Sequence, residues 1–448
     1  MIQIFKLNTA LTFLSAFIIS TGISQDSAVA YQIKYHKKKA ESYLDKEKLL
    51  LPYYAINADG ISIYDSPQNK LKGSFEFHIS WSKIDDFDLY LKKYSRPQVI
   101  EAYKKGDFDK MMPSPNAGSH TAGWPENGTS KLAPGIAPGT NRLKGLKIAI
   151  DAGHIAGDME MGILEKKCLE FTCSNLKGSI DSIEIAEGTL TFAVAKLLKD
   201  KLTAEGAEVF MTRPFNSSSA FGVTFDSWLK TNYKTTVDSL CKAGKLTLSQ
   251  KQFFLSSKAN KRDKFRVIFK DVELAKRAEI INNYKPDITI IIHFNVDETN
   301  TGWRKPADKN FNMTFVGGAF MKNDLSSPEK RFEFIRLLVS RDLENSISLS
   351  SSMIKSFEKN LNVKTASMKD AKYLSEGCLS AGEHGVYCRN LQLTRYVQGP
   401  LVYGETLYQD NINECTALNK ECDKTKNLRI QQVAEAYFQG ILSYAEKQ

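Results

Sequence analysis

Two apolar segments of the chain each end in a histidine. Residues 146–154 (LKIAIDAGH) alternate Ile148 and Ile150 with small residues and end at His154, and residues 287–294 (DITIIIHF) form a β-branched run that reaches His293. Continuous apolar runs of this length are typical of buried parallel strands. Because ligands of open α/β sheets gather at the carboxyl ends of the strands, both histidines are predicted to lie at one functional edge.

Helical periodicity separates these strands. A helix is predicted to begin at Glu187 and to stop at Gly206, and further helices are predicted at 273–283 and 429–445. Additional strands are predicted at 207–212, 313–321 and 399–405, the last of which ends near Glu405. This alternation predicts an α/β fold with a mixed, mostly parallel sheet flanked by helices on both faces.

The remaining pattern divides the chain into segments. Residues 1–30 have the apolar stretch and the A-x-A site of a signal peptide, and polar interruptions argue against a membrane anchor, so no stable span is expected after its removal. Residues 31–112 are predicted to form a small accessory module rich in short strands, with wall targeting or plain packing as its role. Residues 113–142 form a Pro/Gly/Ser-rich linker. A main domain occupies 143–448, with insertions near 214–269 and 300–375.

The charge and the cysteines of the chain bear on its binding partners and on its disulfides. The net charge is +10, which suggests an anionic partner such as a cell wall or a membrane surface, although lysines dispersed along the whole chain equally describe a solvated surface. Nucleic acid is not indicated, because no nucleic-acid-binding motif accompanies the charge. Three close cysteine pairs predict local disulfides, with a structural zinc cluster as the alternative. These pairs are Cys168 with Cys173, Cys378 with Cys388 and Cys415 with Cys422, which leaves Cys241 alone.

Three residues together indicate a metal site. A catalytic zinc ion takes three protein ligands and leaves its fourth position for water. His154 and His293 at two strand ends and Glu187 at a helix start would supply such a set. Each of them alone is readily explained as a structural residue, but three in matching topological positions favour a metal.

The order of these motifs resembles that of the zinc-dependent N-acetylmuramoyl-L-alanine amidases, the Amidase_3 family. The resemblance covers residues from about 147 to the C-terminus and leaves the N-terminal module uncovered. Five landmarks carry it: the strand ending Asp151-Ala152-Gly153-His154, the helix opening at Glu187, the strand ending Thr212-Arg213, the helix with Arg277 before Ile292-His293-Phe294-Asn295, and the strand running from Pro400 to Glu405.

The resemblance implies a peptidoglycan hydrolase that cleaves the amide between N-acetylmuramic acid and L-alanine of the stem peptide. It implies Zn²⁺ as the cofactor, bound by His154, Glu187 and His293, and Glu405 as the general base and then the general acid. Its partners would be peptidoglycan and a protein activator. With the signal peptide, it places the protein outside the cytoplasm, in the periplasm or associated with the cell wall.

Several alternatives stay open at this stage. The gap between His154 and Glu187 is longer than is usual in the family, so Glu165 or Glu170 is an alternative middle ligand. Residues 328–346 occupy the place of a regulatory helix in division-associated members of the family. The apolar residues of this segment would serve either to gate the zinc site or to pack in the core. Residues 214–269 are a further candidate for regulation. Alternative functions are another zinc amidohydrolase or peptidase acting within stem peptides, and a catalytically inactive wall-binding adaptor.

Overall fold

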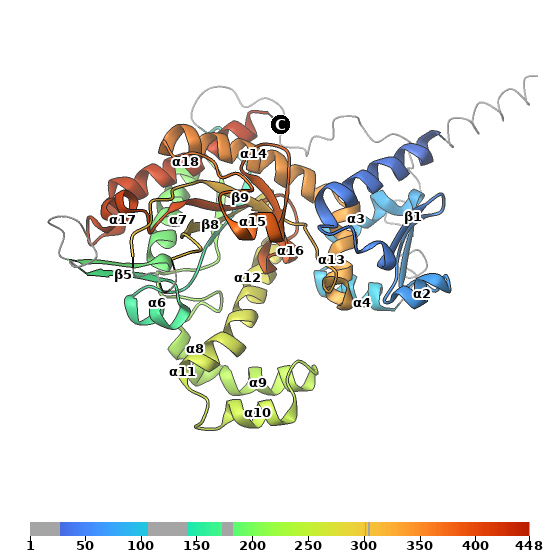
Figure 1. Cartoon of the computed structure of the whole chain (residues 1–448), viewed down its shortest axis with the longest axis horizontal. Coiled ribbons are helices and arrows are strands. Elements are labelled where there is room, and N and C mark those ends of the chain that lie inside the picture. The colour runs from blue at the N-terminus through green and yellow to red at the C-terminus, as the bar shows by residue number, and fades with distance from the viewer. Residues whose placement is uncertain (1–26, 106–140, 173–181, 301, 303–304, 448) are drawn as a thin grey trace, which may run out of the picture. The chain divides into compact units, whose positions relative to one another are not determined.

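The chain is organised as two units (Figure 1). The computed structural model describes residues 27–105, 141–172, 182–300, 302 and 305–447. One unit comprises the chain up to Ala122 together with Phe320–Ser340, and the other comprises Gly123–Ala319 and Arg341–Gln448. Most of the predicted signal peptide and of the predicted linker lies outside the described residues.

A seven-stranded sheet forms the centre of the second unit. Its strands are β4 (Lys147–Ala152), β7 (Glu208–Met211), β8 (Ile288–Asn295), β9 (Met313–Val316), β10 (Cys378–Ser380), β11 (Val386–Arg389) and β12 (Leu401–Tyr408). They are ordered β10-β11-β9-β12-β8-β4-β7, and the four strands from β12 to β7 run parallel. β9 is antiparallel to β12, and β10 is antiparallel to β11. The sheet is therefore mixed and mostly parallel, as predicted.

Helices cover both faces of this sheet. One face carries α7 (Glu187–Ala204), α14 (Asp342–Leu361) and α18 (Leu428–Ala445), and α18 packs against both of the others. The other face carries α12 (Lys270–Tyr284) and α16 (Gln392–Tyr396), whose apolar residues share a core with Ala149 of β4 and Ile291 of β8. The prediction of helices on both faces is confirmed. Two shorter helices, α15 (Lys372–Gly377) and α17 (Ile412–Asn419), complete this part.

The insertion at 214–269 is helical and has a core of its own. It contains α8 (Phe225–Thr231), α9 (Tyr233–Lys242), α10 (Leu248–Leu255), α11 (Lys261–Asp263) and η5 (Lys264–Phe269). Phe225, Trp228 and Phe269 pack together with ring centroids 4.8 to 6.3 Å apart. Figure 1 shows α9 and α10 as a hairpin that extends from the sheet domain. Aromatic burial thus stabilises this insertion locally.

Elements that the sequence did not predict lie between His154 and Glu187. They are α6 (Met159–Glu165), β5 (Cys168–Thr172) and β6 (Ser182–Ala186). β5 and β6 pair antiparallel, with Cys168 opposite Ala186. Next to this pair, the Glu187 N–H donates a hydrogen bond to the Lys167 carbonyl at 3.0 Å. The end of α6 therefore lies close to the start of α7.

The first unit contains a three-stranded antiparallel sheet and several helices. Its strands are β1 (Tyr54–Asn57), β2 (Gly60–Ile63) and β3 (Phe77–Ser80), and its helices include α2 (Pro67–Leu71), α3 (Ile84–Lys93) and α4 (Arg96–Lys104). A helix over residues 27–39 continues into the π-helical turn η1 (Ala40–Leu44). The short strands are those that the aromatic-rich pattern predicts for an accessory module.

Helix α13 (Pro328–Val339) belongs to this first unit, although the sequence pattern placed it within an insertion of the main domain. The chain leaves the second unit after Ala319, forms α13 in the first, and returns at Arg341. Phe332 contacts the rings of Phe87 and Tyr103, and Glu333 accepts hydrogen bonds from Arg96 and Arg336. The apolar stripe of this segment therefore serves core packing, one of its two expected roles.

The predicted disulfides between Cys378 and Cys388 and between Cys415 and Cys422 are wrong, because all four residues are free thiols. In the ladder of β10 with β11, Cys378 lies opposite Arg389, while Cys388 lies opposite Leu379. Paired residues share a face of the sheet and neighbours alternate, so the two sulfurs point to opposite faces. Cys415 is buried and Cys422 is exposed. Cys173 lies outside the described residues, so its pairing with Cys168 stays a prediction.

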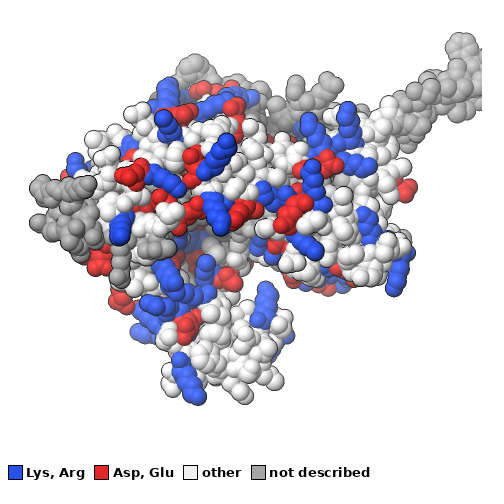
Figure 2. Space-filling model, in the orientation of Figure 1, with Lys and Arg blue, Asp and Glu red and all other residues white. Residues whose placement is uncertain are grey.

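Charged side chains of both signs are visible on one face of the molecule (Figure 2). On the face drawn in Figure 2, Lys and Arg are interspersed with Asp and Glu. This view agrees with the dispersed lysines of the sequence and with a solvated surface. Among the described residues, no helix has the length and apolar content needed to cross a bilayer.

Candidate metal centre

His154, Glu187 and His293 converge at the carboxyl edge of the central strands. Glu187 Oε1 lies 3.3 Å from His154 Nε2 and 3.2 Å from His293 Nδ1. The three candidate ligand atoms lie within 4.8 Å of one another. Ligands around a tetrahedral zinc ion are about 3.3 Å apart, given metal–ligand distances of about 2.0–2.2 Å. The three side chains that the sequence singled out therefore form one cluster of suitable size.

The secondary structure explains this convergence. His154 follows β4 by two residues, His293 lies two residues before the end of the parallel strand β8, and Glu187 is the first residue of α7. β4 and β8 are neighbours in the sheet, with Ala152 opposite Ile292. Glu187 and His293 are buried, and His154 is mostly buried. Rigid elements thus place all three groups.

Two buried arginines hold the loop that carries the first histidine. Arg277 donates to the carbonyls of Ala152 and His154 at 2.6 and 3.1 Å, and Arg213 donates to the Ala152 carbonyl at 3.0 Å. Arg277 also pairs with Asp151 at 3.1 Å and with Glu273 at 2.8 Å. The sequence landmarks at these positions therefore mark residues that fix the backbone around His154.

The loop also needs a glycine. A Cβ added to Gly153 would lie 2.3 Å from His293 Cε1, well inside van der Waals contact. The next residue, His154, has a φ of 58°, in the left-handed region that few non-glycine residues occupy. Such backbone conformations are concentrated at functional sites, where surrounding contacts maintain them.

Glu405 lies beside this cluster on β12. In the parallel ladder of β12 with β8 it is the partner of His293. Two residues earlier on the same face, the Tyr403 ring stacks on the His293 imidazole, with centroids 4.5 Å apart and planes 6° apart. Burial, and then the negative charge of Glu187, raises the pKa of Glu405 to about 8. A carboxyl group with a pKa near neutrality is able to take up and return a proton.

Positive side chains that sequence reasoning missed surround the two carboxylates. Lys167 Nζ lies 3.5 Å from Glu187 Oε2, and the positive charges of Lys167 and Arg389 favour the ionised form of Glu405. Lys167 directly precedes β5, and the pairing of β5 with β6 places it next to Glu187. Arg389 is the last residue of β11. The one sequence signal for Lys167 is the long gap between His154 and Glu187, in which it lies.

The unsatisfied atoms of the cluster match a bound cation. Among the described residues, His154 Nε2 and Glu187 Oε2 are buried atoms that make no hydrogen bond. Burial opposes ionisation of Glu187, but His154 and Lys167 outweigh it and hold the pKa of Glu187 well below its usual range. Burial also lowers the pKa of His293 to about 4, so this imidazole is neutral at pH 7. Neutral imidazole and ionised carboxylate are the forms that bind metal ions.

Neither alternative middle ligand takes part in the cluster. Glu165 Oε1 lies 2.9 Å from His154 Nδ1, on the ring nitrogen that faces away from Glu187. Glu170 is exposed on β5, opposite Glu184 of β6. Glu187 is therefore the carboxylate that both histidines share.

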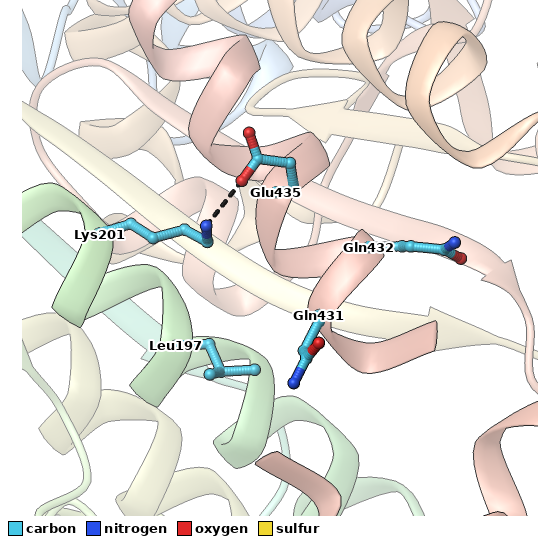
Figure 3. A pocket seen from close by; sticks show the side chains of 5 residues that line it. All are labelled: Leu197, Lys201, Gln431, Gln432 and Glu435. Atoms are coloured by element: carbon cyan, nitrogen blue, oxygen red, sulfur yellow. Dashed lines mark ion pairs between the residues drawn. The ribbon is translucent and has the colours of Figure 1, made fainter. Parts of the chain in front are cut away.

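A separate pocket of about 350 Å³ lies between α7 and α18 (Figure 3). Leu197 and Lys201 line it from α7, and Glu435 from α18 pairs with Lys201 at 2.7 Å. Leu197 is ten residues beyond Glu187, or about 15 Å along the helix. The pocket is thus remote from the metal cluster, and its lining contains no histidine or cysteine.

The α/β sheet thus carries a His/Glu/His cluster that could hold a metal ion, with a buried glutamate beside it. Comparison with protein families gives the particular family. The family model described as N-acetylmuramoyl-L-alanine amidase matches residues 148–443, so the chain belongs to the N-acetylmuramoyl-L-alanine amidase family. The match includes all four residues of the site and leaves the N-terminal module outside, as the sequence resemblance predicted.

Two of the solved structures that the chain matches are described as amidases, at low identity and low TM-score. The CwlD amidase of Clostridioides difficile, solved in complex with the GerS lipoprotein, is 17% identical, covers 68% of this chain and 100% of its own, and has a TM-score of 0.35. The Ami1 amidase of Mycobacterium abscessus is 16% identical, with coverage of 67% and 99% and a TM-score of 0.35. The search of curated proteins found no match.

Proposed function

We propose that the protein hydrolyses the amide between N-acetylmuramic acid and L-alanine with a zinc ion held by His154, Glu187 and His293. The observation that supports this ligand set most strongly is the convergence of three buried ligand atoms, two of whose side chains retain an unsatisfied polar atom. Two imidazoles and a carboxylate are a donor set that zinc accepts, with a fourth position left for water. The family membership supports the reaction.

When bound, zinc supplies Lewis-acid chemistry: it polarises the scissile carbonyl and lowers the pKa of water from ~15.7 toward ~7. Glu405 manages the protons. Its carboxylate takes the proton from the attacking water and later returns it to the nitrogen of the leaving L-alanine amine. Its position beside His293 in the ladder, and its pKa of about 8 before any cation is present, support this role.

Side chains around these groups orient them. Tyr403 fixes the plane of the His293 ring by stacking, and Arg277 and Arg213 fix the backbone of His154. These contacts keep the ligands in place without the metal and so reduce the reorganisation that binding requires.

Export from the cytoplasm and a peptidoglycan substrate form part of the same proposal. The signal-peptide pattern of residues 1–30 supports export to the periplasm or the cell wall, and cell-wall amidases act on a substrate outside the cytoplasm. We further propose that a protein activator controls the enzyme. The alternative of an inactive wall-binding adaptor is less favoured, because all four chemical residues are present.

Substitution of Glu405 tests the proposed mechanism. Glu405→Gln is expected to retain zinc and to release stem peptides from purified sacculi about 10²–10⁴-fold more slowly, because the amide cannot accept the proton. Glu435→Gln on the surface of α18 is the matched control and is expected to be as active as the wild type. A Glu405→Gln variant that works at the wild-type rate would remove Glu405 from the mechanism.

A further inference from the structure

The carboxylate of Glu165 contacts the first histidine from the side opposite the metal cluster. Glu165 Oε1 lies 2.9 Å from His154 Nδ1, while His154 Nε2 lies 3.3 Å from Glu187 Oε1. The Glu165 and His154 side chains are largely buried, with 13% and 14% of their surfaces exposed. The His154 ring is therefore held between two carboxylates, each on a different nitrogen.

The second oxygen of Glu165 binds the backbone of the same loop. Glu165 Oε2 accepts hydrogen bonds from the N–H groups of Ile155 at 3.2 Å and Ala156 at 3.1 Å. These are the two residues that directly follow His154, whose backbone is left-handed. One carboxylate thus fixes both the imidazole and the turn that presents it.

Local structure holds Glu165 in this position. It is the last residue of α6, whose first turn is capped by Asp158 and whose end is closed by the left-handed Lys166. Gly162 allows α6 to approach β5 closely, because a Cβ there would lie 2.7 Å from the Cβ of Cys168. Strand β6, which pairs antiparallel with β5, then leads directly to Glu187. The long segment between the two proposed ligands therefore builds a support for the first of them.

We propose that Glu165 is a positioning residue that keeps the proton of His154 on Nδ1 and so directs the Nε2 lone pair at the metal. This inference rests on the proposed metal site. A ligating histidine commonly donates its second ring N–H to a carboxylate, which fixes the tautomer and the ring orientation. His154 Nε2, which makes no hydrogen bond, is then the free donor atom that faces Glu187.

A glutamine at this position separates the proposal from simple packing. The carboxylate accepts on both oxygens, whereas an amide has a single acceptor oxygen. Glu165→Gln must either present its NH₂ to the backbone N–H groups or present it to Nδ1, and the second choice moves the histidine proton to Nε2. Both outcomes weaken zinc binding while the shape of the side chain is conserved.

The test is the zinc affinity of the full chain, measured by competition with a chromogenic chelator. Glu165→Gln is expected to raise the dissociation constant about 10–100-fold. Glu165→Asp, which keeps both acceptors on a shorter side chain, is expected to recover part of that loss. Glu170→Gln is the matched control on the neighbouring strand and is expected to bind zinc like the wild type. The thermal midpoint of each chelator-treated variant reports whether it folds.

The outcomes distinguish this inference from the proposed function. Wild-type zinc affinity in Glu165→Gln, or an equal loss in Glu170→Gln, overturns the role of Glu165 and leaves the metal site intact. If Glu165→Gln does not fold, the zinc affinity of Glu165→Asp decides. If Glu165→Asp loses as much zinc affinity as a variant that lacks a histidine ligand, the proposal is overturned. A wild-type protein that binds no zinc contradicts the proposed function itself.

Discussion

Each unit of the molecule contains a buried cluster of charged side chains, and the two clusters differ in how they are satisfied. In the first unit, Glu333 accepts hydrogen bonds on both oxygens, from Arg96 and from Arg336. In the second, Glu187 Oε2 and His154 Nε2 are buried and make no hydrogen bond. In the first cluster both carboxylate oxygens have hydrogen-bond donors. In the second, two candidate ligand atoms lack a hydrogen bond, although Glu187 Oε2 lies 3.5 Å from the charged Lys167 Nζ.

This difference shows which kind of buried charge indicates function. Buried ionic groups are costly unless their partners satisfy them, so a closed network such as that of Glu333 is explained by the fold alone. Unsatisfied buried polar atoms are rare in native proteins, and a bound ion is one way in which such atoms are satisfied. We therefore expect the two clusters to respond differently to substitution.

The largest expected effect is the loss of zinc when a ligand is removed. His154→Asn removes the imidazole but keeps a residue type that tolerates the left-handed backbone at this position. The zinc content is expected to fall from near stoichiometric to near zero, together with hydrolysis, as measured by elemental analysis of the purified protein. Stoichiometric zinc in this variant would contradict the assignment of His154.

Substitution in the closed cluster is expected to affect stability and to leave metal binding unchanged. Glu333→Gln removes a negative charge that pairs with the fully buried Arg336, which should lower the free energy of unfolding by about 3 kcal/mol. Denaturant titration measures this loss. Glu101→Gln, whose pair with Lys105 is exposed, is the control and should not change stability. A Glu333→Gln protein with altered zinc affinity would break the distinction between the two clusters.

The smallest expected effect is a change in the pH dependence of zinc binding. Without a cation the pKa of Glu405 is about 8, so the group is mostly protonated at pH 7. A nearby cation favours the carboxylate, so zinc binding should release this proton. The release adds up to about tenfold per pH unit to the rise of zinc affinity between about pH 6 and pH 8. Glu405→Gln releases no such proton, and chelator competition should show a shallower dependence. An unchanged slope would contradict the coupling.

Sequence patterns predicted the strands and helices whose apolar residues follow a regular pattern. The β-branched run before His293 and the helix from Glu187 are both present, because burial on both faces of a parallel sheet leaves a continuous apolar signal. The order of the motifs also predicted which strand ends meet. The sequence alone indicates His154, Glu187 and His293 as candidate ligands, and the structure brings these three side chains together.

Long-range packing was outside the reach of these patterns. The role of Glu165 depends on the β5–β6 register, and the apolar pattern between His154 and Glu187 predicted neither of these strands. Helix α13 has an ordinary apolar stripe, and nothing in its period shows that its core partners are Phe87 and Tyr103, more than 200 positions earlier. The missing disulfides show the same limit, because close spacing of cysteines does not determine which face of a strand each occupies.

Product analysis on purified peptidoglycan tests the central claim most directly. The wild-type protein is incubated with sacculi, with and without a chelator and after zinc is restored, and mass spectrometry identifies the released fragments. We predict stem peptides with a free L-alanine amino terminus and glycan strands that keep intact muramic acid, lost with chelator and regained with zinc. Cleavage within the stem peptide, or release that the chelator does not change, would contradict the account.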